Sequence, residues 1–209
     1  MGEKKNTIPY SDGMNVFERA IKRLFDIVCS FFGILFLLPV FLFVYILIRC
    51  KEGAPVIFKQ ERIGRGGKPF YIFKYRTMSV AAADEEPFLV TNDDCRLTPL
   101  GRFLREYHLD ELPQLWNVLK GDMSFVGPRP ERKYFIDKIV QHNPDYEYLY
   151  LIRPGITSPA TVYNGYTETF EKMLVRLDMD LEYLQKRSLL LDLKIIFTTV
   201  FSIIKGKKI

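Results

Sequence analysis

The stretch IVCSFFGILFLLPVFLFVYILI, residues 27–48, contains no charged residue and has one proline, Pro39, near its centre. A transmembrane helix needs about 20 apolar residues, so the stretch is long enough to cross a bilayer. Proline removes one helical hydrogen bond and its ring crowds the carbonyl of Leu35, so we expect a kink at Pro39. As helices, the two halves would be about 18 and 14 Å long. Neither half alone spans a hydrocarbon core of about 30 Å.

Basic residues flank both ends of this apolar stretch. They are Arg19, Lys22 and Arg23 before it, and Arg49 and Lys51 after it. Lys and Arg beside a membrane segment favour the cytoplasmic side, and here both flanks carry them. A bent helix that enters and leaves by the same face satisfies both flanks. The sequence therefore predicts a re-entrant membrane helix over residues 17–52, with the rest of the chain on the cytoplasmic face.

The apolar stretch has two other interpretations. A cleaved signal peptide is disfavoured, because the stretch exceeds the usual apolar length of about 7–15 residues and no small-residue cleavage site follows it. A straight single span kinked at Pro39 stays open, because proline is common in membrane helices. That topology would place residues 19–23 on the opposite side from the remaining domain.

Composition narrows the class of protein. A chain of 209 residues suggests one domain with its membrane anchor, and the net charge of +5 suits an anionic membrane surface, phosphorylated substrates or nucleic acid. No stripe of aromatic residues between basic ones supports nucleic acid, so no nucleic-acid partner is predicted. The cysteines have no metal or redox spacing, which agrees with a reducing cytoplasm. They are Cys29, Cys50 and Cys95.

The remaining pattern predicts an α+β fold. Two strands, Val56–Phe58 and Phe70–Phe73, are joined by a glycine-rich turn at Gly64–Gly67 and form a short β-hairpin. The acidic, alanine-rich segment Ser79–Asp94 is predicted to be mobile. Helices are predicted over residues 100–107, 109–120, 131–142 and 146–151, with a C-cap at Gly121. The predicted organisation is a flexible N-terminus (1–16), the re-entrant membrane helix (17–52), a small, mostly helical cytoplasmic catalytic domain (53–188) and a C-terminal amphipathic helix (189–209).

The predicted C-terminal helix has one apolar face. The face comprises Leu189, Leu193, Ile196, Val200 and Ile203, and the residues largely off it are Asp192, Lys194, Thr199 and Ser202. Such a helix either lies in the membrane interface or packs against a protein core, and the pattern leaves both open.

The pair Asp110-Glu111 is the first candidate for chemistry. Asp110 is placed as the N-cap of the helix predicted over 109–120, Glu111 lies in its first turn, and Pro113 is tolerated there. These residues are therefore explained by capping alone. The same position also suits catalysis, because a helix N-terminus lowers a carboxylate's pKa and attracts phosphate. An ionised Asp can attack phosphorus, and the adjacent carboxylate can handle a proton or help to hold Mg²⁺.

Basic residues in turns and at strand ends are candidates for phosphate contacts. Lys74 and Arg76 end the second strand, and Arg105 lies five residues before Asp110. If the chain bends tightly at His108, Arg105 comes close to the Asp-Glu pair. The other candidates are Arg102, Arg129 between two prolines, and Arg153 before Pro154-Gly155. His108 and His142 have no partners at metal-ligand spacing and are interpreted as structural.

The motifs together identify a family resemblance. They are Phe58-Lys-Gln60, Arg62-Ile-Gly64, Lys74-Tyr-Arg-Thr-Met78, Leu109-Asp-Glu-Leu-Pro-Gln114 with Asn117, Gly121-Asp-Met-Ser-Phe-Val-Gly-Pro-Arg-Pro130, Arg153-Pro-Gly-Ile-Thr157 and Leu191-Asp-Leu-Lys-Ile195. In these motifs the chain resembles the bacterial monotopic phosphoglycosyl transferases, which start glycan assembly on a polyprenol phosphate. The motifs run in family order from about Phe17 to the end of the chain.

The resemblance implies a reaction. A UDP-sugar binds with Mg²⁺, the carboxylate of Asp110 attacks the sugar-bearing phosphorus, and UMP leaves. The phosphosugar then passes to polyprenol (undecaprenyl) phosphate and gives polyprenyl-diphospho-sugar, the first membrane step of glycan assembly such as that of exopolysaccharide. Glu111 is the partner in the catalytic dyad, Asp110 is the implied metal ligand, and Pro128-Arg129-Pro130 is associated with the nucleotide. The substrate-binding set is Lys74, Arg76, Arg105, Gln114, Pro128, Arg129, Pro130 and Arg153.

The resemblance also implies the setting. The membrane helix breaks at Pro39, and the protein lies at the bacterial inner membrane with its catalytic domain in the cytoplasm. Membrane lipids and downstream glycosyltransferases are the further partners. The chain departs from the family at Leu38, at Thr157-Ser-Pro-Ala-Thr161 and at Asn164-Gly165-Tyr166. The last two changes fall where sugar contacts are expected, so the sequence does not specify the sugar.

Two other functions compete with this one. A membrane-bound phosphatase or pyrophosphatase would use the same Asp110 nucleophile with water as the final acceptor. A membrane scaffold or nucleic-acid-binding protein would use the basic surface and would bind with a strong dependence on salt, indifferent to Asp110.

Overall fold

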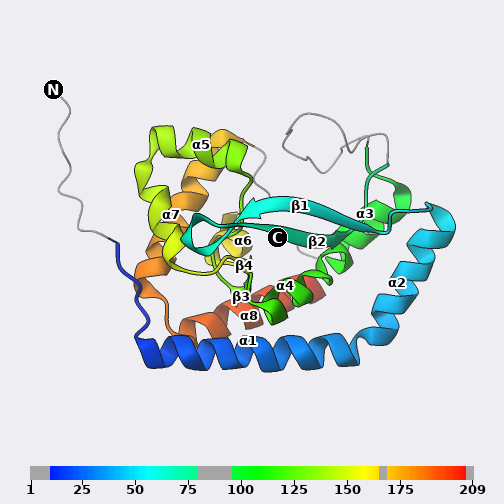
Figure 1. Cartoon of the computed structure of the whole chain (residues 1–209), viewed down its shortest axis with the longest axis horizontal. Coiled ribbons are helices and arrows are strands. Elements are labelled where there is room, and N and C mark those ends of the chain that lie inside the picture. The colour runs from blue at the N-terminus through cyan, green and yellow to red at the C-terminus, as the bar shows by residue number, and fades with distance from the viewer. Residues whose placement is uncertain (1–9, 80–95, 165–168, 206–209) are drawn as a thin grey trace.

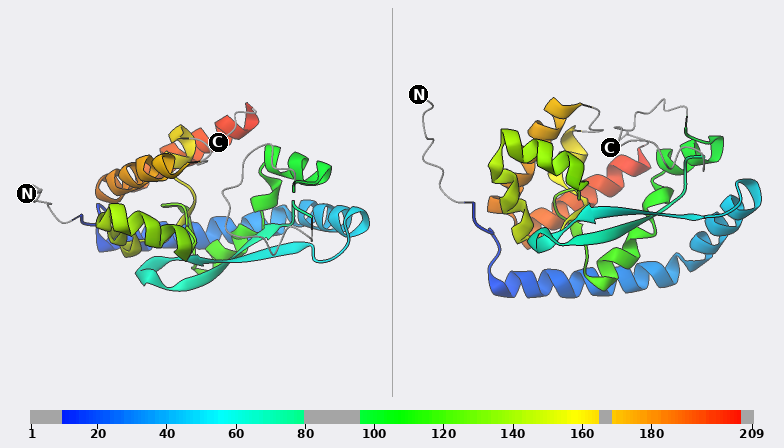
Figure 2. Two further views of the ribbon diagram at one scale, coloured as in Figure 1. Left: turned by 90° about the horizontal axis from the view of Figure 1, so that it is seen from above. Right: turned by 45° about the horizontal axis from the view of Figure 1, so that its top comes forward.

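The computed structural model describes residues 10–79, 96–164 and 169–205 (Figure 1). Its elements in chain order are α1 (Val16–Phe36), α2 (Leu38–Lys51), β1 (Ile57–Ile63), η1 (Arg65–Gly67), β2 (Pro69–Tyr75), α3 (Pro99–Glu106), η3 (Leu109–Glu111), α4 (Gln114–Lys120), β3 (Ser124–Val126), α5 (Lys133–His142), η4 (Pro144–Leu151), β4 (Gly155–Thr157), α6 (Pro159–Asn164), α7 (Phe170–Lys186) and α8 (Leu189–Ile204). The predicted α+β class is confirmed. The long helix α1 runs along one side of the molecule, α2 turns away at its end, and α5 and α7 lie together at the opposite end from α2 (Figures 1 and 2).

Helix α1 buries its polar residues and exposes its apolar ones. It begins with a capping box, in which the Asn15 side chain accepts from the Glu18 N–H and the Glu18 carboxylate accepts from the Asn15 N–H. The buried residues Lys22, Asp26 and Ser30 recur every four positions, so they share the face that packs against the rest of the protein. The exposed apolar residues include Phe17, Leu24, Val28, Phe31, Phe32, Leu35 and Phe36. This is the reverse of a water-soluble amphipathic helix.

Helices α1 and α2 meet at a bend of 60°. In the described part of the chain no single helix is long and apolar enough to cross a membrane, whereas these two pass that test only as a bent pair. The predicted break beside Pro39 is confirmed, with the interruption two residues before the proline. The helix is interrupted at Leu37, and Pro39 lies in the first turn of α2. Proline is tolerated there, because the first N–H groups of a helix have no intrahelical partner.

The predicted β-hairpin is present but longer than predicted. Strands β1 and β2 pair antiparallel along seven residues each, with Phe58 opposite Lys74. The connection η1 contains Gly66 and Gly67 at φ of +71° and +70°, a conformation that favours glycine. The second half of β1 is mostly charged and carries no apolar alternation, and no side chain of this strand is fully buried.

The single helix predicted over residues 109–120 is wrong, and Asp110 is not its N-cap. A short 3₁₀ turn, η3, holds Leu109–Glu111, and α4 begins only at Gln114. His108 has a left-handed conformation with φ 54°, which reverses the chain after α3. Pro113 has no N–H to continue hydrogen bonding into α4, so the regular helix starts after it. The predicted end is confirmed, since Gly121 caps α4 at φ 102°.

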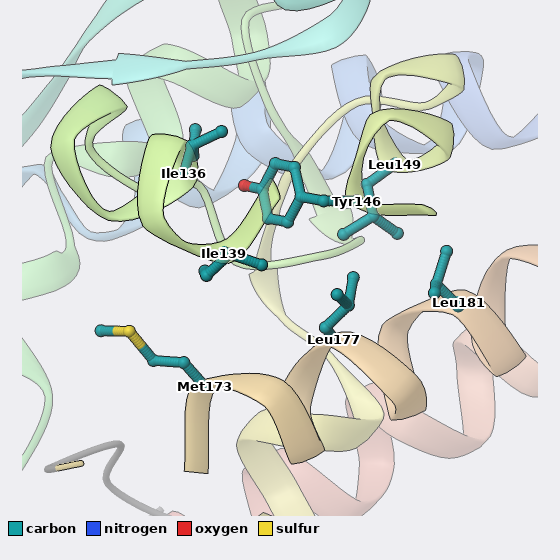
Figure 3. Packing of buried hydrophobic residues seen from close by; sticks show 7 residues of the cluster. All are labelled: Ile136, Ile139, Tyr146, Leu149, Met173, Leu177 and Leu181. Atoms are coloured by element: carbon teal, nitrogen blue, oxygen red, sulfur yellow. The ribbon is translucent and has the colours of Figure 1, made fainter. Parts of the chain in front are cut away.

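A hydrophobic cluster joins α5, η4 and α7 (Figure 3). Its buried members are Ile136, Ile139, Tyr146, Leu149, Met173, Leu177 and Leu181. The helices predicted over 131–142 and 146–151 are confirmed with shifted bounds, and the second is a 3₁₀ helix. The cluster packs α7 against α5 and η4.

The parallel pair β3–β4 was not predicted. The strands are three residues each, too short to give a recognisable pattern. They approach so closely that a Cβ atom on Gly155 would lie 2.1 Å from the backbone nitrogen of Gly127. Glycine at both positions therefore allows the chain after β3 to lie directly against β4.

The predicted apolar face of the C-terminal helix does not match the face that α8 buries. Asp192, predicted off that face, is buried between α1 and α7: it accepts from Lys22 Nζ at 2.5 Å and from the Tyr183 hydroxyl at 2.6 Å. Leu193 and Val200, predicted on the face, are exposed. The apolar periodicity of α8 was correct. It could not show that the buried ion pair between Asp192 and Lys22 turns a polar side of this helix toward the protein.

Some predictions concern parts of the chain outside the described residues. They are the predicted mobility of Ser79–Asp94, of which only Ser79 is described, the residues Gly165 and Tyr166, and the ends of the chain, 1–9 and 206–209.

Candidate active site

Asp110 and Glu111 lie in the turn η3, which follows α3 in the chain and packs against it. Asp110 is 5% exposed. The chain reversal at His108 brings Arg105 close enough to lower the pKa of Asp110, as predicted from the expected bend. Arg105 is itself oriented by its Nε, which donates to the Thr77 hydroxyl at 3.0 Å. The structure therefore holds a buried carboxylate beside a fixed guanidinium.

Lys74 reaches the site from β2. Its Nζ donates to Oε1 of Glu111 at 2.5 Å, with both side chains about four-fifths buried. The strand is fixed against α4 by Asn117, which is fully buried. The Asn117 carboxamide accepts from the Phe73 N–H at 3.1 Å and donates to the Tyr71 carbonyl at 2.7 Å. These bonds set the position of Lys74 relative to the turn that precedes α4.

Arg129 approaches the same carboxylate from another direction. Its Nη1 lies 4.0 Å from Oε1 of Glu111, and its side chain is 36% exposed. Pro128 and Pro130 on either side are buried. The two prolines are thus embedded in the protein, and the arginine between them extends toward the dyad.

The two carboxylates of the dyad have different pKa values. Burial raises the pKa of Asp110 to about 6, with Glu111 raising it further while Lys74 and Arg105 oppose the rise. Burial would also raise the pKa of Glu111, but Lys74 and Arg129 outweigh it and hold that pKa at about 2. The expectation that a helix N-terminus lowers the pKa of Asp110 is wrong, because Asp110 lies in a buried 3₁₀ turn ahead of α4. Pairs whose pKa values are driven apart mark sites of acid–base or nucleophilic chemistry.

Two of the other predicted substrate residues, Arg76 and Arg153, donate to backbone carbonyls elsewhere. Arg76 turns to the end of α2, where its Nη2 donates to the Glu52 carbonyl at 2.7 Å. Gln114 is buried at the start of α4. The Nε of Arg153 donates to the Gly121 carbonyl at 2.9 Å, at the end of α4 remote from the dyad. The structure brings Lys74, Arg105 and Arg129 to the dyad and does not bring Arg153 there.

Sequence reasoning missed several residues near the site. Burial, with Lys74 and Arg129, lowers the pKa of His108, and the charge of Glu111 opposes this. A tight bend at His108 was expected, but its left-handed conformation was not. Arg176 and Asp180 were also missed, because no helix was predicted where the structure has α7; polar residues one turn apart on the apolar face of a helix are a recognisable signal.

The dyad is compatible with Mg²⁺. The described residues contain no group of three or more His, Cys, Asp or Glu that could hold a metal ion. Mg²⁺ does not require one, because it usually keeps several waters and is held by one or two carboxylates together with substrate phosphates. Glu111 is already engaged by Lys74, so Asp110 is the more available ligand.

Comparison with known proteins places this site in a family. A family model described as bacterial sugar transferase matches residues 17–206, and the chain belongs to that family. Among curated relatives, a UDP-glucose:undecaprenyl-phosphate glucose-1-phosphate transferase of Klebsiella pneumoniae is 40% identical over 212 residues, which covers 95% of this chain and 44% of the relative.

Two further relatives illustrate the range of the family. A UDP-N-acetylgalactosamine-undecaprenyl-phosphate N-acetylgalactosaminephosphotransferase of Aeromonas hydrophila is 37% identical over 186 residues, 89% of this chain and 44% of the relative. A Bacillus subtilis protein named as the uncharacterized sugar transferase EpsL is 38% identical over 189 residues, 90% of each chain. The chain thus spans less than half the length of the first two relatives and nearly all of the third.

Proposed function

We propose that the protein transfers a sugar-1-phosphate from a UDP-sugar to polyprenol phosphate through a phosphosugar carried on Asp110. Family membership and the names of two relatives support the reaction class. The observation that carries the role of Asp110 is its setting: a buried carboxylate with pKa near 6, beside a Glu111–Lys74 pair and within the influence of Arg105.

In the first step, an oxygen of the Asp110 carboxylate attacks the phosphorus that bears the sugar. The bond between that phosphorus and the bridging oxygen of the diphosphate breaks, and UMP leaves with the electron pair. In the second step, a phosphate oxygen of polyprenol phosphate attacks the same phosphorus. The acyl-phosphate bond breaks, Asp110 regains its carboxylate, and polyprenyl-diphospho-sugar is formed.

Positive charge is required because an anion attacks an anionic phosphoryl group. Repulsion between the two is strong in a partly dry site, so compensating cations placed in advance stabilise the transition state. Lys74 and Arg105 surround the attacking carboxylate, and Arg129 is the candidate for the departing nucleotide. Glu111, held ionised by Lys74, keeps that lysine directed at the reacting centre.

A magnesium ion fits the same arrangement, with Asp110 and the substrate phosphates as its ligands. When bound, it supplies further neutralisation of phosphate charge. The residues of the chain still provide the nucleophile and the positioning of both substrates.

The lipid acceptor is expected to reach the site from a membrane contacted by α1, α2 and α8. These helices share an unusual feature, large apolar side chains exposed in the absence of lipid. Examples are Phe31 and Phe36 on α1, Phe43 and Ile46 on α2, and Leu190, Phe197 and Phe201 on α8. We propose that the bent pair α1–α2 re-enters the membrane and that α8 lies in its cytoplasmic interface.

The reaction is tested with purified protein, polyprenol phosphate and radiolabelled UDP-sugars, beginning with UDP-glucose and UDP-N-acetylgalactosamine. We expect a lipid-soluble labelled product with at least one donor, strictly dependent on polyprenol phosphate. EDTA is expected to abolish formation of this product, because removal of Mg²⁺ leaves the phosphate charge uncompensated. Added Mg²⁺ is expected to restore it. Release of free sugar phosphate at the same rate without the lipid would support the phosphatase alternative. Full turnover in EDTA would remove the metal from the proposal.

The topology is tested by cysteine labelling in intact cells. In a variant lacking Cys29, Cys50 and Cys95, we place single cysteines at Thr7 and, on the exposed side of α7, at Glu182. Both are expected to be shielded from an impermeant thiol reagent and to react after permeabilisation, because a re-entrant pair keeps both ends on one side.

Pro39→Ala is the matched variant, expected to expose part of the Thr7→Cys population by straightening the bend. Labelling of Thr7→Cys alone in the parent protein would show that the segment crosses.

A further inference from the structure

The chain on the two sides of Arg129 is anchored to different strands. Before this residue, two backbone hydrogen bonds tie the chain to β4. They run from the Gly127 N–H to the Thr157 carbonyl (3.0 Å) and from the Gly155 N–H to the Pro128 carbonyl (2.9 Å). After Arg129, the chain is tied to β1 instead. The place of the arginine therefore depends on both anchors.

The anchor on β1 is the guanidinium of Arg62. Its Nη1 donates to the Pro130 carbonyl at 3.0 Å and to Oε2 of Glu131 at 3.3 Å. Its Nη2 donates to the Gln60 side chain at 2.6 Å, which fixes the guanidinium from the other side. The Ile63 N–H also donates to the Glu131 carbonyl at 3.1 Å. One arginine side chain thus holds the last residue of the Pro-Arg-Pro element and the residue that follows it.

Glu131 connects this arginine to a second one. Glu131 is 7% exposed, and its other carboxylate oxygen accepts from Nη1 of Arg176 at 2.7 Å. Arg176 lies on α7, which the hydrophobic cluster packs against α5 and η4 (Figure 3). Burial lowers the pKa of Arg62 to about 10 and Glu131 opposes that fall, so the guanidinium is charged at neutral pH. Because a buried ion pair is weak evidence for stability, the geometry that this network imposes explains it better.

We propose that Arg62 is a positioning residue for the nucleotide: it fixes the backbone that carries Arg129 and so holds that guanidinium beside Glu111, in reach of the phosphates of the UDP-sugar. The inference rests on the proposed role of Arg129 in the reaction. Both Nη atoms of Arg62 are engaged within the protein, so Arg62 does not itself bind the substrate. A fixed backbone is important because any shift of the segment moves the Arg129 guanidinium with it, and a misplacement of about 1 Å can cost about 100-fold in rate.

The test is a double-mutant cycle read by UDP binding. The affinity for UDP in the presence of Mg²⁺ is measured by calorimetry on the whole chain in detergent. Arg129→Ala is expected to weaken binding about tenfold or more, because a charge-assisted contact to phosphate is lost. Arg62→Met is expected to weaken it about fivefold or more, because the segment is released on one side. In the Arg129→Ala background the same change is expected to add less than about twofold, since both residues act through one guanidinium.

Arg62→Met leaves Glu131 paired with Arg176, so the buried carboxylate keeps one partner. If this variant does not fold, Arg62→Lys replaces it in the cycle, because lysine keeps the charge but lacks the planar fork that makes the three hydrogen bonds. The control is Arg65→Met, which removes the same charge at an exposed position in the connection of the same hairpin. It is expected to leave UDP affinity unchanged.

Equal losses from Arg62→Met in both backgrounds would show that Arg62 acts on UDP independently of Arg129, and would overturn the proposal. Parent-like affinity in Arg62→Met would overturn it too, as would an equal loss in Arg65→Met, which would indicate a general effect of charge. Normal affinity in Arg129→Ala would remove Arg129 from the nucleotide site, and only that result would also contradict the proposed function.

Discussion

Asp110→Asn is expected to reduce turnover by about 1,000-fold or more while the protein stays folded, because an amide cannot replace a carboxylate as the attacking group. The substitution preserves size, and Asp110 is not the N-cap of α4, so no cap is lost. Burial already raises the pKa of this carboxyl, so losing the buried charge is not expected to destabilise the fold. The expected defect is therefore chemical.

The decisive measurement is transfer of label to the protein. With a UDP-sugar labelled at the phosphorus attached to the sugar, the parent protein should retain label in the absence of polyprenol phosphate and release it when the lipid is added. Asp110→Asn should retain none. Because the adduct would be an acyl phosphate, hydroxylamine should also discharge it. Near-normal turnover of Asp110→Asn, or labelling of the variant equal to the parent, would exclude the covalent route through this residue.

Lys74→Met is expected to lower activity by about 100- to 1,000-fold. The lysine lowers the pKa of both dyad carboxylates, and its Nζ makes the 2.5 Å bond to Glu111. Without it, two adjacent buried carboxylates repel each other, so both pKa values rise and one group takes up a proton near neutral pH. The phosphates of the substrate lose a cation at the same time. Methionine retains most of the side-chain volume, so the effect on packing is small.

The pH profile separates this electrostatic role from a packing role. A raised pKa means that the reactive ionised form is recovered only at higher pH, so the acid limb of the activity profile of Lys74→Met should shift toward higher pH than that of the parent. Lys59→Met is the matched control, since Lys59 is an exposed lysine on the neighbouring strand β1. It should leave both rate and profile unchanged. An unshifted acid limb in Lys74→Met would show that the lysine does not set the protonation of the dyad.

Several features were predictable because their signals are local in the sequence. The bend in the apolar segment, the hairpin with its glycine turn and the end of α4 at Gly121 each depend on residues a few positions apart. The Asp-Glu pair was also found this way, and the approach of Arg105 followed from a tight turn at His108. These predictions rest on proline and glycine stereochemistry and on helical and strand periodicity, which act within a single segment.

Other features depend on partners far apart in the chain. Lys74 meets Glu111 across 37 positions, and Arg176 meets Glu131 across 45. Helix α8 exposes several apolar side chains because Asp192, on its other side, pairs with Lys22 across 170 positions. No periodicity in one segment contains this information, because it depends on which elements the fold packs together.

By itself, then, the sequence determined the β-hairpin, several of the helices, the bent apolar segment, the family motifs and the candidate dyad. Only the tertiary structure decided that Asp110 lies in a buried 3₁₀ turn rather than at a helix N-terminus, so that its pKa is raised instead of lowered. It likewise decided that Arg153 lies away from the dyad. The physical reason is that burial and long-range charge pairs, which set both pKa and side-chain direction, exist only once separate segments have packed.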